Sequence, residues 1–235
     1  MLHLEPRPEA SEAMRYASPA IAVALTLACG MIVFAILGKN PAEGFKVFFL
    51  NPIRDLDAIA ELLLKATPLM LIAVGLAVGF RANVWNIGAE GQFLTGAVGA
   101  TGIALAFKET HAALLLPSMV VAGAMGGALW AAIPALLKTR FNANEILTSL
   151  MLVYIAQLMV SWLVFGPWKD PAGFNFPQTE TFQDAALLPM LIEGTRLNYA
   201  FAIAVAALAA GYVFMEKSYT GFKMRVAGES EAAAR

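Results

Sequence analysis

Residues 79–93 read Gly79-Phe80-Arg81-Ala82-Asn83-Val84-Trp85-Asn86-Ile87-Gly88-Ala89-Glu90-Gly91-Gln92-Phe93. Amides, a carboxylate and glycines gather here at the start of an otherwise apolar segment. Polar groups at membrane depth are costly, so they usually face a cavity or another helix. Glycine permits a broken or closely approached backbone, and transporters use interrupted helices to line a pathway. We therefore expect a broken or re-entrant span at this point.

The composition of the whole chain is that of a membrane protein. The 235 residues are 59% hydrophobic and 14% charged, whereas soluble domains carry about 25% charged residues. The mean hydropathy is +0.67. A net charge of −1 argues against a nucleic-acid partner. The single cysteine, Cys29, excludes a disulfide framework and a cysteine-based metal site within the chain. We expect no metal and no cofactor.

Six apolar runs are long enough to be membrane helices, because crossing about 30 Å of hydrocarbon takes about 20 residues. Open strands cannot cross lipid, so the expected fold is an all-α, polytopic bundle forming one domain over residues 1–235. The expected spans are residues 19–37, 62–80, 84–107, 112–137, 146–165 and 199–215, the third being the broken one. Residues 40–64 suit an amphipathic helix on the membrane face. Residues 216–235 form a short charged tail after the last span, suited to contact a soluble partner.

Lysine and arginine near the span ends set the expected orientation. With the N-terminus inside, the short inner segments contain Arg81, Lys138 and Arg140, and further basic residues follow the last span. The outer segments are longer, so the inner density of positive charge is higher. The N-terminus is therefore expected to be cytoplasmic.

Two interpretations of the polar stretch remain open. Asn83 and Asn86 could cap helices, with the small residues that follow serving close helix packing. Alternatively, the stretch could line a solute pathway. Glu90 discriminates between them, because it lies well past the cap and its charge needs a partner or water. Farther along, Asn144 precedes the span at 146–165, where a helix cap is the favoured interpretation.

Enzyme motifs do not occur in the chain. It has no Gly-x-Ser-x-Gly elbow, no His-Glu-x-x-His and no phosphate loop. We therefore expect a protein that is not an enzyme. If it drives transport, the energy must come from elsewhere.

Three blocks of sequence, in the same order, resemble those of a known family. Residues 79–92 resemble the signature of permease subunits of bacterial ABC importers, in the branch that contains ribose, branched-chain amino acid and nucleoside permeases. Residues 142–151, Asn-Ala-Asn-Glu-Ile-Leu-Thr-Ser-Leu-Met, are similar to a second block of the nucleoside (simple-sugar-type) group. Residues 221–235 resemble that family's cytoplasmic coupling segment, although members often have proline where Glu231 stands. Family members are longer, so the resemblance implies further spans beyond Arg235.

The resemblance implies a transport subunit in the bacterial inner (plasma) membrane. Its implied partners are an ABC ATPase subunit, a second permease subunit and an extracytoplasmic substrate-binding lipoprotein, besides the membrane lipid. Nucleosides are the expected solute, and simple sugars such as ribose are the alternative. Two rivals belong to other classes: an ion-coupled secondary transporter, for which Glu90 is the one plausible titratable group, and a membrane scaffold without transport.

The candidate functional residues fall into two sets. Mixed apolar and polar groups suit a small neutral solute, and aromatic rings could stack on a base. The expected pathway residues are Asn83, Trp85, Asn86, Glu90, Gln92 and Phe93, with Asn144 and Thr148 as second choices. The expected ATPase-coupling residues are Gly221, Lys223, Arg225, Gly228 and Glu229.

Overall fold

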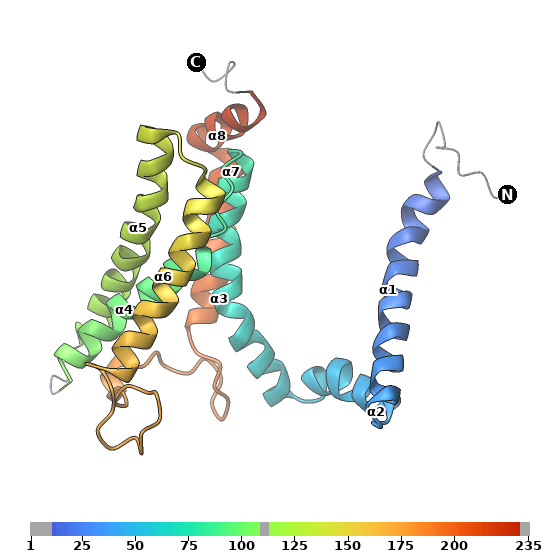
Figure 1. Cartoon of the computed structure of the whole chain (residues 1–235), viewed down its shortest axis with the longest axis horizontal. Helices are drawn as coiled ribbons and strands as arrows, with labels where there is room; N and C mark the ends of the chain where they lie inside the picture. The colour runs from blue at the N-terminus through green and yellow to red at the C-terminus, as the bar shows by residue number, and fades with distance from the viewer. Residues whose placement is uncertain (1–10, 109–112, 231–235) are drawn as a thin grey trace. The chain divides into compact units, whose positions relative to one another are not determined.

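The computed structural model describes residues 11–108 and 113–230, and these are mostly helical (Figure 1). The helices are α1 (Glu12–Ile36), α2 (Pro41–Phe45), α3 (Leu56–Arg81), α4 (Ala89–Ala106), α5 (Leu115–Phe141), α6 (Glu145–Phe165), α7 (Ala200–Lys217) and α8 (Tyr219–Glu229), with short helical turns at Lys46–Leu50, Asn51–Ile53 and Asp184–Ala186. Within the described ranges, β-structure is limited to one isolated bridge between Met190 and Asn198. The expected all-α class is confirmed.

Five of these helices, α1, α3, α5, α6 and α7, are long and apolar enough to cross a membrane. Most of their residues are not buried inside the chain, so their apolar side chains are free to contact lipid. Helix α4 is not among the five, because Glu90, Gln92 and several glycines dilute its apolar residues. The interruption expected in the third segment is present, since α4 begins only at Ala89 and residues 84–88 are not helical. The total of six spans stays a prediction.

The chain divides into two compact units, residues 1–62 and 63–235. In the first, Pro41 opens α2 and Asn40 caps it, its Oδ1 accepting the Ala42 amide at 3.0 Å. Gly44 packs against the ring of Phe34 at the end of α1. The single amphipathic helix expected over residues 40–64 is replaced by α2, the two short helical turns after it and the start of α3 at Leu56.

In the second unit, α4 packs against α5 through contacts of backbone on backbone. A Cβ atom added at Gly99 would lie 2.6 Å from the Ala122 carbonyl oxygen, and one at Gly126 would lie 2.6 Å from that of Thr95. Such distances leave room for glycine alone, as in small-residue helix interfaces within membranes. Gly127 similarly approaches the carbonyl of Gln92. The small residues that follow the polar stretch thus serve close helix packing, as one of the two interpretations expects.

The long connection between α6 and α7 lies at one end of the second unit, and α8 lies at the other end (Figure 1). The connection is held to the residues that follow α4 by an ion pair of 3.1 Å between Lys108 and Glu180. Gln183 also donates to the carbonyl of Phe107 at 2.9 Å. One end of this unit therefore consists mainly of an irregular connection, and the other end carries the helix α8.

We expect Gly99→Ala to destabilise the protein and Gly75→Ala to leave it intact. The new methyl group at Gly99 would overlap the Ala122 carbonyl, whereas nothing lies within 4 Å of a Cβ at Gly75. Overpacking of this kind lowers the free energy of unfolding by about 1–3 kcal/mol. Thermal unfolding of the two variants in the same detergent measures the difference. Equal stability would contradict the backbone contact between α4 and α5.

Candidate functional site

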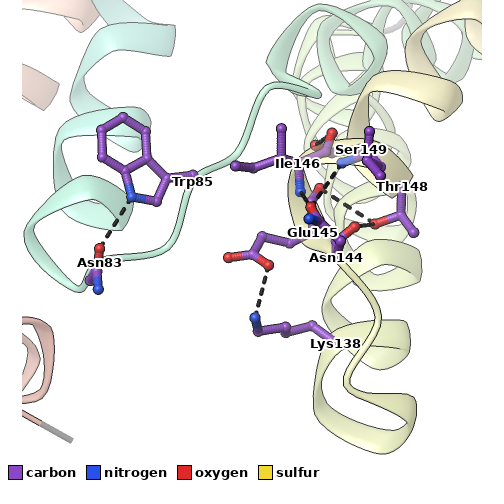
Figure 2. Close-up of polar contacts among 9 residues, drawn as sticks. Asn83, Trp85, Lys138, Asn144, Glu145, Ile146, Thr148 and Ser149 are labelled. Carbon is purple, nitrogen blue, oxygen red and sulfur yellow. Dashed lines mark hydrogen bonds and ion pairs between the residues drawn. The ribbon is translucent and has the colours of Figure 1, made fainter.

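The polar stretch begins where α3 ends. Asn83 adopts a left-handed backbone with φ of 57°, and the Val84 amide donates to the Gly79 carbonyl at 2.9 Å. Asparagine tolerates this conformation, which closes helices at their C-termini. The Asn83 Oδ1 accepts the indole N–H of Trp85 at 3.1 Å (Figure 2). Asn83 therefore terminates α3, as the capping interpretation expects.

The next residues cross to α6 without forming a helix. The Asn86 Oδ1 accepts the Gly88 amide at 2.9 Å, and the Ile87 amide donates to the Ser149 Oγ at 3.3 Å. Gly88 is buried, and a Cβ there would lie 2.9 Å from that of Ser149. Because unpaired backbone groups are costly in lipid, irregular backbone needs such partners. Residues 83–88, called here the crossing segment, are thereby fixed on the first turns of α6.

One pair of amides separates two cavities of the second unit. The Asn86 Nδ2 donates to the Gln92 Oε1 at 3.2 Å. On one side of this pair lies a groove of about 500 Å³, which Leu71 and Phe93 also line. On the other side lies a cavity of about 270 Å³, which Glu145 lines. Both amides line both spaces, so a polar solute in either one can hydrogen-bond to them.

Glu90 is placed apart from this pair. Its Oε1 accepts the Gln157 Nε2 of α6 at 2.9 Å, and both side chains are exposed. Residues two positions apart in a helix differ by about 200° around its axis, so Glu90 and Gln92 face opposite sides of α4. Asn86, Gln92 and Phe93 line the groove together, whereas Glu90 lines neither the groove nor the smaller cavity.

Asn144 and Thr148 belong to the start of α6. The Asn144 Oδ1 accepts the amides of Ile146 and Leu147 at 3.0 and 3.2 Å, and the Thr148 hydroxyl donates to the Asn144 carbonyl at 3.0 Å. Figure 2 shows this cap beside the ion pair of 2.9 Å between Lys138 and Glu145. The capping role favoured for Asn144 is confirmed, and its contact with solute stays a prediction.

Helix α8 contains the five expected coupling residues, but they do not share one face. Gly221 is buried, and a Cβ there would lie 2.8 Å from the Met215 carbonyl oxygen. A Cβ at Gly228 would lie 3.0 Å from the Arg81 carbonyl carbon and overlap its oxygen. Both glycines therefore face the chain itself. Lys223 and Glu229 are exposed.

The outer face of α8 also carries aromatic residues that the sequence interpretation did not select. Tyr219 and Phe222 are 73% and 52% exposed, and the Lys223 Nζ lies 4.6 Å from the centre of the Tyr219 ring. Aromatic residues are enriched at protein interfaces. Their spacing of three residues is a sequence signal that could have identified them.

Two further side chains link separate elements and were also missed. Ser149 supports the crossing segment, although it lies within the block at 142–151. Glu216, near the end of α7, contacts Arg81 at 3.4 Å and Arg225 at 2.8 Å. The sequence signal for Glu216 is a lone acidic residue that closes an apolar run and precedes a basic segment.

A multi-pass helical membrane protein with an interrupted, amide-rich segment beside its cavities has the architecture of a membrane permease. The chain belongs to the family described as branched-chain amino acid transport system / permease component, which it matches over residues 58–235. No solved structure shows a significant match to the chain.

Three curated relatives resemble the chain. The glucose ABC transporter permease protein TsgB13 of Haloferax volcanii is 37% identical over all of this chain and 64% of its own length. The guanosine ABC transporter permease protein NupP of Bacillus subtilis is 28% identical over 92% of this chain and 62% of its own length. The nucleoside ABC transporter permease protein NupB of Lactococcus lactis is 26% identical over 89% of this chain and 60% of its own length. The chain thus spans somewhat less than two thirds of these relatives.

We expect Asn144→Ala to destabilise the protein by about 1 kcal/mol, because the first amides of α6 lose their acceptor. Asn144→Asp keeps an oxygen in place and should retain near-normal stability. Solute uptake by the assembled transporter separates the remaining pathway role from capping. Normal uptake by Asn144→Asp means that the amide nitrogen is dispensable. Loss of uptake at full stability would instead place this side chain in the pathway.

Proposed function

We propose that this chain is the transmembrane permease portion of an ATP-driven importer that moves nucleosides across the plasma membrane. Because the chain spans about 60–64% of its curated relatives, the activity belongs to the whole assembled protein. The observation that carries the proposal is the crossing segment, which is fixed on α6 and contains Asn86, whose amide pairs with that of Gln92 at the lining of two cavities.

In this proposal the pathway follows the amide pair. Asn86 and Gln92 exchange their mutual hydrogen bond for bonds to the solute, which costs little because one polar contact replaces another. Trp85 and Phe93 are each about half exposed and offer aromatic faces for a base. Glu90, on the other side of α4, contributes where a second permease subunit or further spans complete the wall.

The solute class rests on two observations. Amides with aromatic rings fit a solute that combines hydroxyl groups with a flat base, and two of the relatives are named as guanosine or nucleoside permeases. The alternative is a monosaccharide, because the relative with 37% identity is named as a glucose permease. A sugar would use the amides and leave the rings without a stacking partner.

The proposed orientation places α8 on the cytoplasmic side. Arg81, Lys138, Arg140, Lys217, Lys223 and Arg225 lie at the ends of α3, α5 and α7 or in α8, at the same end of the second unit (Figure 1). Within the described residues, the opposite end of that unit carries Lys65, Lys108, Lys169 and Arg196 over a longer segment. A higher density of basic residues marks the cytoplasmic side, and α1 then begins in the cytoplasm.

The proposed partners follow from this orientation. An ABC ATPase binds the outer face of α8, which consists of Tyr219, Phe222, Lys223 and Glu229. A second permease subunit completes the pathway, and an extracytoplasmic binding lipoprotein delivers the solute. Gly221 and Gly228 act on the inner side of α8, where they let it lie close to α7 and α3.

We expect the full-length permease, assembled with its partners in proteoliposomes, to take up labelled guanosine when ATP is supplied. Excess unlabelled nucleoside should suppress this uptake, whereas excess glucose should leave it unchanged. Replacing Trp85 by Leu should weaken nucleoside uptake, because base stacking contributes about 1–3 kcal/mol. Suppression by glucose alone would support the monosaccharide alternative. Uptake without ATP would contradict an ATP-driven importer.

We expect a crosslinker at Lys223→Cys to capture the ATPase subunit. The experiment uses a Cys29→Ser background, because Cys29 is the single cysteine and is exposed. Phe174→Cys is the matched control, since this residue is 99% exposed and lies in the connection at the opposite end of the unit. Capture from Phe174→Cys but not from Lys223→Cys would reverse the proposed orientation.

A further inference from the structure

A single carboxylate joins three helices at the end of the second unit where α8 lies. Glu216 is near the C-terminus of α7, Arg81 ends α3, and Arg225 belongs to α8. The Glu216 Oε2 lies 2.8 Å from an Arg225 nitrogen, and the Oε1 lies 3.4 Å from an Arg81 nitrogen. The side chains of Glu216 and Arg225 are each 31% exposed, and that of Arg81 is 59% exposed. Charge-assisted hydrogen bonds in partly buried positions are stronger than pairs in open water.

Helix α8 also touches the residues immediately before the crossing segment. Gly228 is packed on the backbone of Arg81 and Ala82, with 3.1 Å between its hypothetical Cβ and the Ala82 carbonyl carbon. Gly221 is packed on the end of α7 at the other end of α8. A rigid helix of this length cannot move at its outer face without displacing both contacts. The crossing segment follows directly after one of them, at Ala82, and carries Asn83, Trp85 and Asn86.

We propose that Glu216 is the positioning residue that transmits a displacement of α8 to the crossing segment. The proposal rests on the proposed function, in which α8 binds the ATPase. The short contact to Arg225 keeps the carboxylate with α8. The longer contact to the more exposed Arg81 breaks and re-forms as α8 moves. With the Arg81 contact made or broken, α8 therefore interacts with the end of α3 to a different extent. Coupling between two sites requires such a difference in interaction free energy between two states.

The shared carboxylate distinguishes transmission from simple support. If Glu216 only held α8 against α7, the pair with Arg225 would suffice and Arg81 would be irrelevant. If it transmits motion, both arginines are needed. The variants that distinguish the two roles therefore restore the contact between positions 216 and 225 first, and the contact with position 81 second.

The test uses the full-length permease assembled with its ATPase in proteoliposomes, and it measures ATP hydrolysis and solute uptake in the same samples. In Glu216→Gln we expect the ATPase to remain bound and active, while the solute moved per ATP falls about fivefold or more, the low end of typical coupling between sites. Lys217→Gln is the matched control, since it removes an adjacent exposed charge and should leave that ratio unchanged. If Glu216→Gln fails to assemble, Arg81→Gln replaces it, because Arg81 is largely exposed and its loss should uncouple transport in the same way.

Exchanging charges provides the second arm. Glu216→Arg combined with Arg225→Glu restores the contact between α7 and α8 but sets the newly introduced guanidinium against that of Arg81, so we expect assembly without coupling. Adding Arg81→Glu should restore the solute moved per ATP. Normal coupling in Glu216→Gln or Arg81→Gln, or full recovery in the double exchange, would overturn the inference. Failure of the unaltered permease to bind an ATPase would instead overturn the proposed function.

Discussion

Residues 82–88 are not helical, although the helices around them have apolar outer surfaces. The rest of the second unit depends on the hydrogen-bond partners of this backbone. An amide without a partner costs several kcal/mol in hydrocarbon. Asn86 and Ser149 supply acceptors for two of these amides, and Gly88 lets the chain approach α6 closely enough to reach them. The interruption of the helix therefore depends on residues of α6 as well as on those of the segment itself. It also places the Asn86 side-chain amide against that of Gln92.

Much of the fold was predictable because hydropathy and length have direct physical causes. The span predicted at 146–165 and the helix at 145–165 nearly coincide. Helix α3 extends past the span expected at 62–80, because its first turns include the polar residues Asp57 and Glu61 ahead of the apolar run. The helix begins earlier, where Asp55 accepts the Ala58 amide at 2.8 Å. Local caps are set by neighbouring residues, and for that reason Asn144 could be interpreted correctly from the sequence alone.

The candidate site was less predictable, because its contacts join distant parts of the chain. Glu216 and Arg81 are 135 residues apart, and no local pattern indicates that they meet. The inward packing of Gly221 and Gly228 depends on where α3 and α7 end relative to α8. Similarly, Glu90 and Gln92 face opposite sides only because α4 starts at Ala89 and both residues are helical. If this stretch were extended, or if α4 started farther along the chain, the two side chains would lie differently with respect to the cavities.

The contrast between two helix interfaces has a consequence for motion. Helices α4 and α5 touch through main-chain atoms, which cannot slide past one another without first separating. By comparison, α3 and α7 enclose a groove of about 420 Å³ lined largely by aliphatic side chains, among them Met70, Leu208 and Met215. Flexible side chains can repack as such a space narrows or widens. The α4–α5 interface is therefore the stiffer of the two, and a change in helix spacing is accommodated more readily at the groove between α3 and α7.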